Sequence, residues 1–520
     1  MPKIVINEKD ETTSGVITEN TDIVFVPGFV NYADADPDVL MEIGELRQFD
    51  SISEFVAACG TKPMKLKKND ENGTLVDDTG YIMAKELLAS GLSVVYCRLN
   101  NQVKGNDLFT AVGDKQPLDW DTAYTSYYES KNGSDIGCTP IAKTTDGKAP
   151  TYNSAEVRQL ITYETITVDV IDDNGEKVQK DVLNAQNQME AIFAIENVYG
   201  LMDKGNYNVK YLTSGGYPSL FINYEQVTDP LTKEPVVDNQ GDPKMQFVTD
   251  SALAMKMLNM AETRGDCVAL IDYQDLEAVR DDMTTIEDIH DAVTDAFKNS
   301  NGEYAAMFAP WAHYNRKTTG GVSDLYLPAS FGYLCALANA IKVYPNFLAI
   351  AGATRGRIPS LRKIDAHEII PNSIADQIQD REKNICSINS ITQIKPYGDV
   401  IWGNRTLKLI TEDLVATNFL NLRNMISDIK KVVYSAARAL TFEQDSDILW
   451  LNFKSRITPL MDRMVSGNGL TGYKIIKDTE NVNAKKKGVL CAKIILYPAY
   501  AVEDFYITVI MRDADDVTVE

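Results

Sequence analysis

The sequence has few of the side chains on which most enzymes depend. Only three of its 520 residues are histidines, and none lies beside a serine or cysteine nucleophile motif. His313, near Trp311, is the best candidate for a general base, but a lone histidine is more often structural. The patterns H-E-x-x-H, G-x-S-x-G and Walker A are absent. The sequence therefore predicts a protein that is not an enzyme and uses no cofactor.

Cysteines are few and are not spaced for pairing. Their count of seven is odd, and no CxxC pair occurs. Cys97 and Cys335 lie in apolar runs, where a free cysteine behaves as a small hydrophobic side chain. The acidic clusters at 281–282 and 513–516 lack the alternating ligands and the glycine of a calcium loop. We expect a reducing compartment, with no disulfide framework and no metal centre.

Long apolar runs and an excess of positive charge are also missing. No run of about 18 apolar residues could cross a membrane, and the first eight residues lack the apolar core of a signal peptide. The formal net charge of −23 argues against a nucleic-acid binder, which needs basic side chains facing the phosphates. We therefore expect synthesis in a cytoplasm, no membrane insertion and no nucleic-acid partner.

What the chain does have is an alternation of apolar strands and helices. Residues 22–28 form a strand pattern ended by Pro-Gly, and residues 80–99 a helix, a glycine stop and a second strand. Residues 250–264 have helical spacing, and the apolar strand that begins at Cys267 ends at Asp272. Because such alternation is typical of a parallel sheet covered by helices, we predict a multidomain α/β (α+β) protein.

Residues 100–187 differ from this pattern and indicate an insertion. Apolar periodicity is weak there, and turn residues are frequent. In one hairpin, Asn174-Gly175 follows an alternating strand at 166–171 and precedes a second strand that starts at Glu176. Asn-Gly suits the positive φ values of a type I′ turn. We expect a β-rich outer insertion.

The sequence from Gly467 to Gly472 matches G-x-G-x-x-G in a reversed context. A dinucleotide site needs a strand before this sequence and a helix after it. Here the helix pattern, 459–465, comes first, and the strand pattern, 473–476, comes second. The match therefore predicts a turn and no nucleotide site.

Several short motifs follow one another in the second half of the chain. They are the strand ending at Asp272, Tyr304-Ala305-Ala306, Pro310-Trp311, Pro328-Ala329-Ser330, Ala351-Gly352, and a segment from Ile388 to Leu407 that contains Trp402, Arg405 and Thr406. In this order and spacing the motifs resemble those of contractile tail sheath proteins of phages and phage-derived injection machines. The resemblance covers about half of the chain, and residues 100–187 lie outside it.

Together, composition and resemblance divide the chain into six segments. These are an N-terminal linker arm at 1–21, the first part of the core at 22–99, a β-rich outer insertion at 100–187, a middle α/β domain at 188–345, a C-terminal sheath core domain at 346–500, and a C-terminal strand or arm at 501–520.

The resemblance implies a structural subunit that polymerises helically around a tail tube, in stacked hexameric rings, and contracts to drive the tube through a target envelope. Its partners would be copies of itself, the tail tube protein, and baseplate and tail terminator proteins. The protein would be assembled in the host cytoplasm and would reside in a virion tail or an extracellular contractile particle. An α/β enzyme with an unrecognised site and a non-contractile capsid or virion structural protein stay open as alternatives.

A basic helix is expected at residues 420–440 of this acidic chain. Its charged residues are the cations Arg423, Lys430, Lys431 and Arg438 and the single carboxylate Asp428, which leaves a net charge of +3. An ordinary helix with a cationic solvent face is one reading of this pattern. The other is a tube-facing helix that lines the inside of a sheath and docks on an acidic tube through weak exposed contacts.

Apolar strands are also expected near both ends of the chain. Their residues are Lys3, Ile4, Val5 and Ile6 at the N-terminus and Phe505, Ile507 and Val509 near the C-terminus. Such strands could complete the chain's own sheets. The resemblance implies instead that they are inter-subunit linkers, which add to the sheets of neighbouring copies through main-chain hydrogen bonds. It also implies that Trp402, Arg405 and Thr406 fix the C-terminal core.

Overall fold

The computed structural model describes a large part of the chain, which divides into two compact units. Apart from short gaps, the described residues are 22–99, 200–226, 245–274, 286–479 and 489–502, with isolated short segments between 140 and 194. The units comprise 1–439 and 440–520, so the predicted segment 346–500 is shared between them. The expected linker strands at Lys3–Ile6 and at Phe505, Ile507 and Val509 lie outside the described residues.

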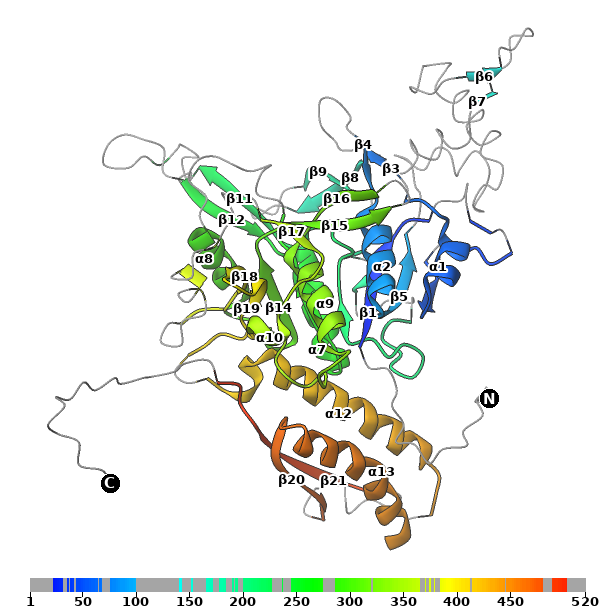
Figure 1. The fold of residues 1–520 in the computed structure, drawn as a ribbon, viewed down its shortest axis with the longest axis vertical. Coiled ribbons are helices and arrows are strands. Elements are labelled where there is room, and N and C mark those ends of the chain that lie inside the picture. The colour runs from blue at the N-terminus through cyan, green and yellow to red at the C-terminus, as the bar shows by residue number, and fades with distance from the viewer. Residues whose placement is uncertain are drawn as a thin grey trace, which may run out of the picture. The chain divides into compact units, whose positions relative to one another are not determined.

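An eight-stranded sheet forms the centre of the first unit (Figure 1). Its strands are β1 (Ile23–Gly28), β2 (Leu46–Phe49), β5 (Ser93–Arg98), β10 (Tyr211–Leu212), β13 (Val268–Ile271), β14 (Ala305–Ala309), β18 (Asn389–Ile394) and β19 (Gly398–Trp402). The spatial order is β19-β18-β14-β13-β10-β1-β5-β2. The six inner strands are parallel, and β2 and β19 pair antiparallel at the edges. The predicted parallel sheet is thus confirmed.

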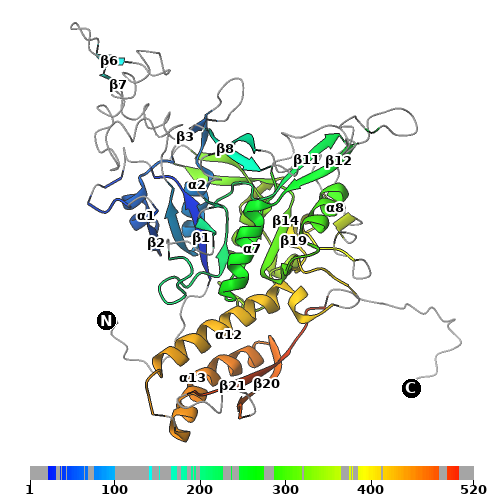
Figure 2. The ribbon, with the colours of Figure 1, turned by 180° about the vertical axis from the view of Figure 1, so that it is seen from behind.

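Helices cover both faces of this sheet. They are α1 (Ile52–Cys59), α2 (Thr79–Ser90) and α9 (Ala329–Ala340) on one face and α7 (Ala252–Arg264) and α8 (Ile286–Phe297) on the other. Figure 1 shows α2 and α9 in front of the sheet, and Figure 2 shows α7 in front of the opposite face. Side chains of β1 alternate between the two cores: Phe25 packs in one, Val24 and Val26 in the other. The near-continuous apolar strands follow from this two-sided burial.

The start of α2 lies close against β1. Asp78 caps the helix, and its carboxylate accepts hydrogen bonds from the backbone N–H groups of Gly80 (3.1 Å) and Tyr81 (3.2 Å). Gly80 has no room for a side chain, because a Cβ there would overlap the carbonyl oxygen of Pro27. Gly91, at φ +97°, ends the helix in the left-handed region.

Smaller elements complete the first unit. The paired strands are β3 (Lys65–Lys67) with β4 (Leu75–Asp77), β6 (Pro140–Ala142) with β7 (Thr151–Tyr152), β8 (Thr165–Ile171) with β9 (Lys177–Leu183), β11 (Phe221–Gln226) with β12 (Met245–Asp250), and β15 (Ala312–Thr318) with both β16 (Gly321–Leu327) and β17 (Leu361–Lys363). Short helical turns are η3 (Gly302–Tyr304), α10 (Gly352–Arg355) and η4 (Ala416–Asn418). Ile171 pairs with Lys177, so the hairpin expected around Asn174-Gly175 is confirmed.

The last helix of the first unit, α12 (Leu420–Ala439), crosses the amino-terminal edge of the parallel sheet (Figure 1). Its hydrogen-bond partners are residues that precede β10, β13 and β14 in the sequence. The helix thus contacts several inner strands where they begin.

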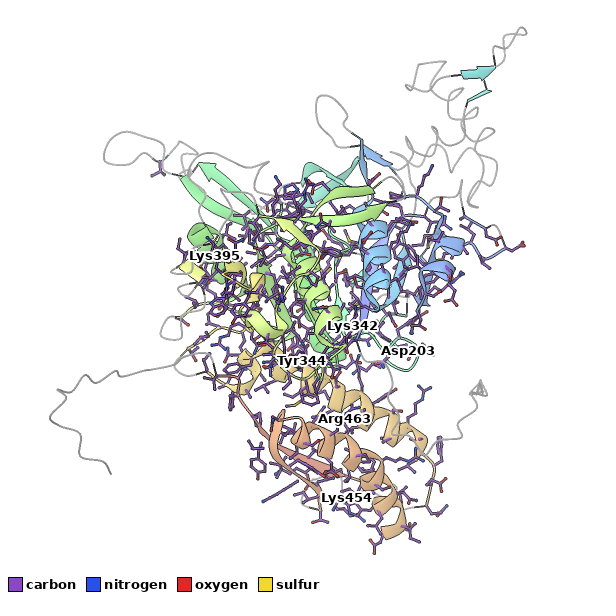
Figure 3. The ribbon with its side chains drawn as sticks, in the orientation of Figure 1. Asp203, Lys342, Tyr344, Lys395, Lys454 and Arg463 are labelled. Carbon is purple, nitrogen blue, oxygen red and sulfur yellow. The ribbon has the colours of Figure 1, made fainter. Side chains whose placement is uncertain are left out.

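The second unit is a helix packed on a hairpin. Its elements are α13 (Asp447–Ser466), β20 (Leu470–Lys477) and β21 (Ala492–Pro498), and the two strands pair antiparallel. Phe453, Ile457 and Leu460 are buried along α13, whereas Lys454 and Arg463, labelled in Figure 3, are exposed. The G-x-G-x-x-G sequence begins directly after α13 and runs into the first three residues of β20. Its expected reversed context, helix first and strand second, is confirmed.

Two buried carboxylates lie at the carboxyl edge of the sheet in the first unit. Burial raises the pKa of Asp272, which follows β13, from 3.8 to about 7, although a hydrogen bond from Ser330 Oγ opposes this increase. Burial also raises the pKa of Asp78 to about 6, against hydrogen bonds from Tyr217 and three backbone N–H groups. The fold therefore favours the protonated form of both groups.

This predicts that the free energy of unfolding falls as the pH rises from about 4 to about 7. An acid whose pKa is raised on folding contributes stability that is complete below pH 3.8 and is lost as the pH passes the folded-state pKa. A tenfold difference in proton affinity between the folded and unfolded chain corresponds to about 1.4 kcal/mol. Urea unfolding of wild type and Asp272→Asn at several pH values should show the variant gaining relative stability with pH. The exposed Asp291→Asn is the control, and equal pH profiles for wild type and Asp272→Asn would refute the assignment.

Candidate functional site: the seam beneath α12

The residues singled out by the sequence meet in one region, the seam between α12 and the amino-terminal edge of the sheet. We call this set of contacts the α12 seam. It includes Arg405 and Thr406 in the segment that leads to the helix, Arg423, Asp428 and Lys431 on the helix, and the starts of the strands beneath. The seam consists of hydrogen bonds and ion pairs made within one chain.

Asn389, the first residue of β18, organises the start of the seam. Its side-chain amide donates to the carbonyl oxygens of Met307 (3.1 Å) and Arg405 (2.9 Å), and its Oδ1 accepts from the backbone N–H of Arg405 (2.7 Å). Asn389 is fully buried, and each of these groups would cost free energy if left unpaired. One side chain thus joins β14, β18 and the segment that leads to α12.

The motif residues Trp402, Arg405 and Thr406 have different environments. Arg405 is buried, and its guanidinium lies 4.5 Å from the ring centroid of Phe419. Thr406 is also buried, and its hydroxyl donates to the carbonyl of Thr417 (2.8 Å). Both residues thus make their contacts within the first unit, and their role in fixing the core stays a prediction. Trp402 lies at the end of β19 with 38% of its surface exposed, so its indole is only partly buried in the core.

Arg423 is the first charged residue of α12, and it is turned inward. Its guanidinium lies 3.8 Å from the ring centroid of Tyr304 and 3.1 Å from a carboxylate oxygen of Glu303. Glu303 also pairs with Lys408, at 3.1 Å. Because only 3% of Arg423 is exposed, these partners replace the water that a free guanidinium would require.

Near the start of β10, the contacts of the seam are made by Lys431 and Asp428. The ammonium of Lys431 donates to the carbonyl oxygens of Asn208 (3.2 Å) and Val209 (2.9 Å), and burial lowers the pKa of this lysine to about 8. Asp428 pairs with the fully buried ammonium of Lys210 at 2.9 Å. Buried charged side chains are usually paired with an opposite charge or hydrogen-bonded, as these two are.

These placements correct the expected cationic solvent face of the helix. Arg423 and Lys431 are 3% and 6% exposed, so within the single chain they bind the body of their own subunit and are not open to a tube. Lys430 donates to the Gly265 carbonyl (2.9 Å) but stays largely exposed, and Arg438 is exposed near the end of the helix. The physical reason is that the i, i+4 and i, i+8 positions share one helix face, here the one against the sheet.

Several residues of the seam were missed at the level of sequence. Lys210 and Glu303 precede strands and belong to no motif with a known spacing, and Asn389 lies in the motif segment from Ile388 to Leu407 but was given no role of its own. They have partners only because the fold brings the starts of β10, β14 and β18 close to α12 and to the segment before it. A lysine between the apolar residues Val209 and Tyr211 was the one weak signal that a buried cation was present.

The described part of the chain offers no other obvious chemistry. Within it, no three His, Cys, Asp or Glu side chains gather as metal ligands would. Among the helices described, none combines the length and apolar character needed to cross a membrane. His313 contacts Asp324 (2.7 Å) and lies 4.7 Å from the ring of Tyr326, a surface cluster on the small sheet.

Comparisons with known proteins give matches among solved structures. The chain is similar to the helical sheath of the anti-feeding prophage in its contracted state, with 14% identity, 98% of this chain and 99% of that chain covered, and a TM-score of 0.49. It is also similar to sheath chains from two other sources. One belongs to the PVC extracellular contractile injection system in its contracted state (12% identity, 99% and 98% covered, TM-score 0.44). The other is a sheath tail protein from Desulfitobacterium hafniense (11% identity, 97% and 99% covered, TM-score 0.42). No protein-family model matches the chain, and no curated protein matches it.

The seam predicts that charge reversal at Lys431 lowers the free energy of unfolding much more than charge reversal at the adjacent Lys430. Lys431→Glu would place a carboxylate among backbone carbonyls and beside Asp428, at a cost of about 3 kcal/mol or more. Lys430→Glu, at an exposed position, should change the free energy of unfolding by no more than about 1 kcal/mol. Urea unfolding of both variants measures this difference. Equal stability of the two would show that Lys431 is not part of the seam.

Proposed function

We propose that this chain is the structural subunit of a contractile sheath, which polymerises helically around a tail tube and contracts to drive the tube through a target envelope. Its partners are further copies of itself, the tail tube protein, and baseplate and tail terminator proteins. Assembly takes place in the host cytoplasm, and the finished sheath belongs to a virion tail or an extracellular contractile particle. Contraction draws on a difference in inter-subunit packing between two lattice states.

The observation that carries the proposal is the ordered motif series between Asp272 and Thr406. Three of its members stand at strand ends of the eight-stranded sheet: Asp272 follows β13, Pro310-Trp311 follows β14, and Trp402 ends β19. The motifs thus belong to the framework of the first unit. Residues that frame a sheet, with Arg405 and Thr406 engaged in intramolecular contacts, suit a structural subunit better than an enzyme.

The exposure of the cations limits which residues of α12 can take part in the proposed tube contact. Lys430 and Arg438 are the two residues of the expected tube-facing set that remain exposed on α12. Exposed ion pairs are worth about 0.2–1 kcal/mol each. A few such pairs per subunit suit a sheath that must hold a tube and then release it.

The proposal predicts that the full-length protein, purified alone, assembles into tubes visible by negative-stain electron microscopy. Deleting residues 1–20, or all residues after Tyr500, should leave a soluble monomer, because the terminal strands that link neighbouring copies are lost. Sedimentation velocity measures the loss of assembly, and unchanged melting temperatures show that the truncated chains are folded.

The other function classes give different results in the same experiments. Closed shells or flat sheets would favour a non-contractile capsid or virion protein. A monomer whose melting temperature rises with a small ligand would favour an enzyme. Normal tubes from both truncated chains would overturn the role of the termini.

A second prediction concerns the tube contact. The double variant Lys430→Glu/Arg438→Glu should still form sheath but should co-assemble poorly with the tube protein, because both remaining cations of the helix are reversed. Co-sedimentation of variant and tube protein at low and physiological salt measures this effect, which salt should weaken. Lys298→Glu, at an exposed position just after α8, serves as the control. Undiminished co-assembly would exclude this helix from the tube contact.

A further inference from the structure

The most deeply buried ionic cluster of the described chain lies at the far end of the α12 seam. The ammonium of Lys210 is 2.9 Å from a carboxylate oxygen of Asp22 and 2.9 Å from one of Asp428, and its side chain has no exposed surface. The side-chain amide of Asn346 donates to the other oxygen of Asp22 (2.9 Å) and to Asp428 (3.3 Å). We call Asp22, Lys210 and Asp428 the Lys210 triad.

The three members of the triad come from distant parts of the chain. Asp22 directly precedes β1 and directly follows the proposed linker arm, residues 1–21. Lys210 precedes β10, and its backbone N–H also donates to the carbonyl of Ile23 (2.8 Å). Asp428 lies on α12, the helix after which the chain enters the second unit at Leu440. The triad therefore joins the start of β1, the first strand after residues 1–21, to the middle of α12, the last helix before the second unit.

The charges of the triad are not explained by the stability of the fold alone. Burial alone would lower the pKa of Lys210, but the two carboxylates outweigh burial and raise it, so the lysine stays protonated. Lys431, on the same helix, is the other cation near Asp428. Removing one member of such a cluster leaves a buried charge without its partner, whereas replacing all charges by neutral groups of similar size is often nearly neutral for stability. Because neutral side chains could stabilise the fold equally well, stability alone does not explain why this cluster is charged.

We propose that the Lys210 triad is a mechanical clamp that carries tension between the root of the N-terminal arm and the helix that leads into the second unit. Charge-assisted hydrogen bonds are short, strong and geometrically specific, so β1 and α12 cannot separate until these bonds break. If neighbouring subunits are linked through their ends, part of the tension that enters at Asp22 passes through the triad directly to α12, beside the path through β1 and the sheet. This use of the clamp rests on the proposed sheath function, but the clamp itself is a property of the single chain.

Single-molecule force spectroscopy on the full-length chain tests the clamp. Azide-bearing residues at positions 20 and 439 provide handles that load the contact between β1 and α12. The comparison is between wild type and the charge-free variant Lys210→Met/Asp22→Asn/Asp428→Asn, whose melting temperature is measured first. We expect the first rupture along this axis to move to a lower force in the variant. Handles at positions 54 and 298, on α1 and after α8, give a control axis along which both proteins should rupture at the same force.

The outcomes decide between a clamp and an ordinary stabilising cluster. An unchanged rupture force along the 20–439 axis, or an equal decrease along both axes, would overturn the proposal. If the triple variant does not fold, Lys210→Met/Asp428→Asn removes one positive and one negative charge together and leaves Asp22 hydrogen-bonded to Asn346, with the same expected difference between axes. Because single chains are pulled, failure of the protein to form tubes would contradict the sheath proposal and leave this result intact.

Discussion

Burial of charge beneath α12 is the constraint on which the rest of the first unit depends. Arg423, Lys431 and Lys210 lie in a nearly dry region, where an unpaired cation would be very costly. Each therefore has to meet a carboxylate, an aromatic ring or backbone carbonyl oxygens at the beginning of a strand. Once these contacts are formed, the helix can lie across the amino-terminal edge of the sheet in only one register. Two apolar cores then fill the faces between the same strands and the covering helices.

Much of the architecture could be predicted because it follows from local patterns. The alternating apolar strands and helices of residues 22–99 and 250–309 predict a parallel sheet, and two-sided burial explains their continuous hydrophobicity. The reversed context of the sequence between Gly467 and Gly472 could also be read locally, since helix and strand patterns lie on either side of it. Long-range pairing was beyond reach: the sequence does not say that β10, only two residues long, lies between β1 and β13.

The candidate site was predictable only in part. Composition identified a basic helix, and helical periodicity cannot tell a cationic face turned to solvent from one turned to a sheet lined with carboxylates and carbonyl groups. The outcome was decided by Glu303 and by the carbonyl oxygens of Asn208 and Val209, which are far from the helix in the sequence. Arg405 and Thr406, in contrast, belong to a compact motif, and both are buried. The same motif leaves Trp402 partly exposed, which no pattern in the sequence indicated.

In the single chain α12 belongs to the body of its own subunit, and in the proposed sheath the ends of the chain make the assembly. Hydrogen-exchange mass spectrometry of the same protein as monomer and as assembled tubes tests this division of roles. We expect peptides from 420–431 to be equally protected in both states, whereas peptides from 1–21 and 503–520 should gain protection on assembly. Large new protection of 420–431 with unchanged exchange at both ends would contradict it.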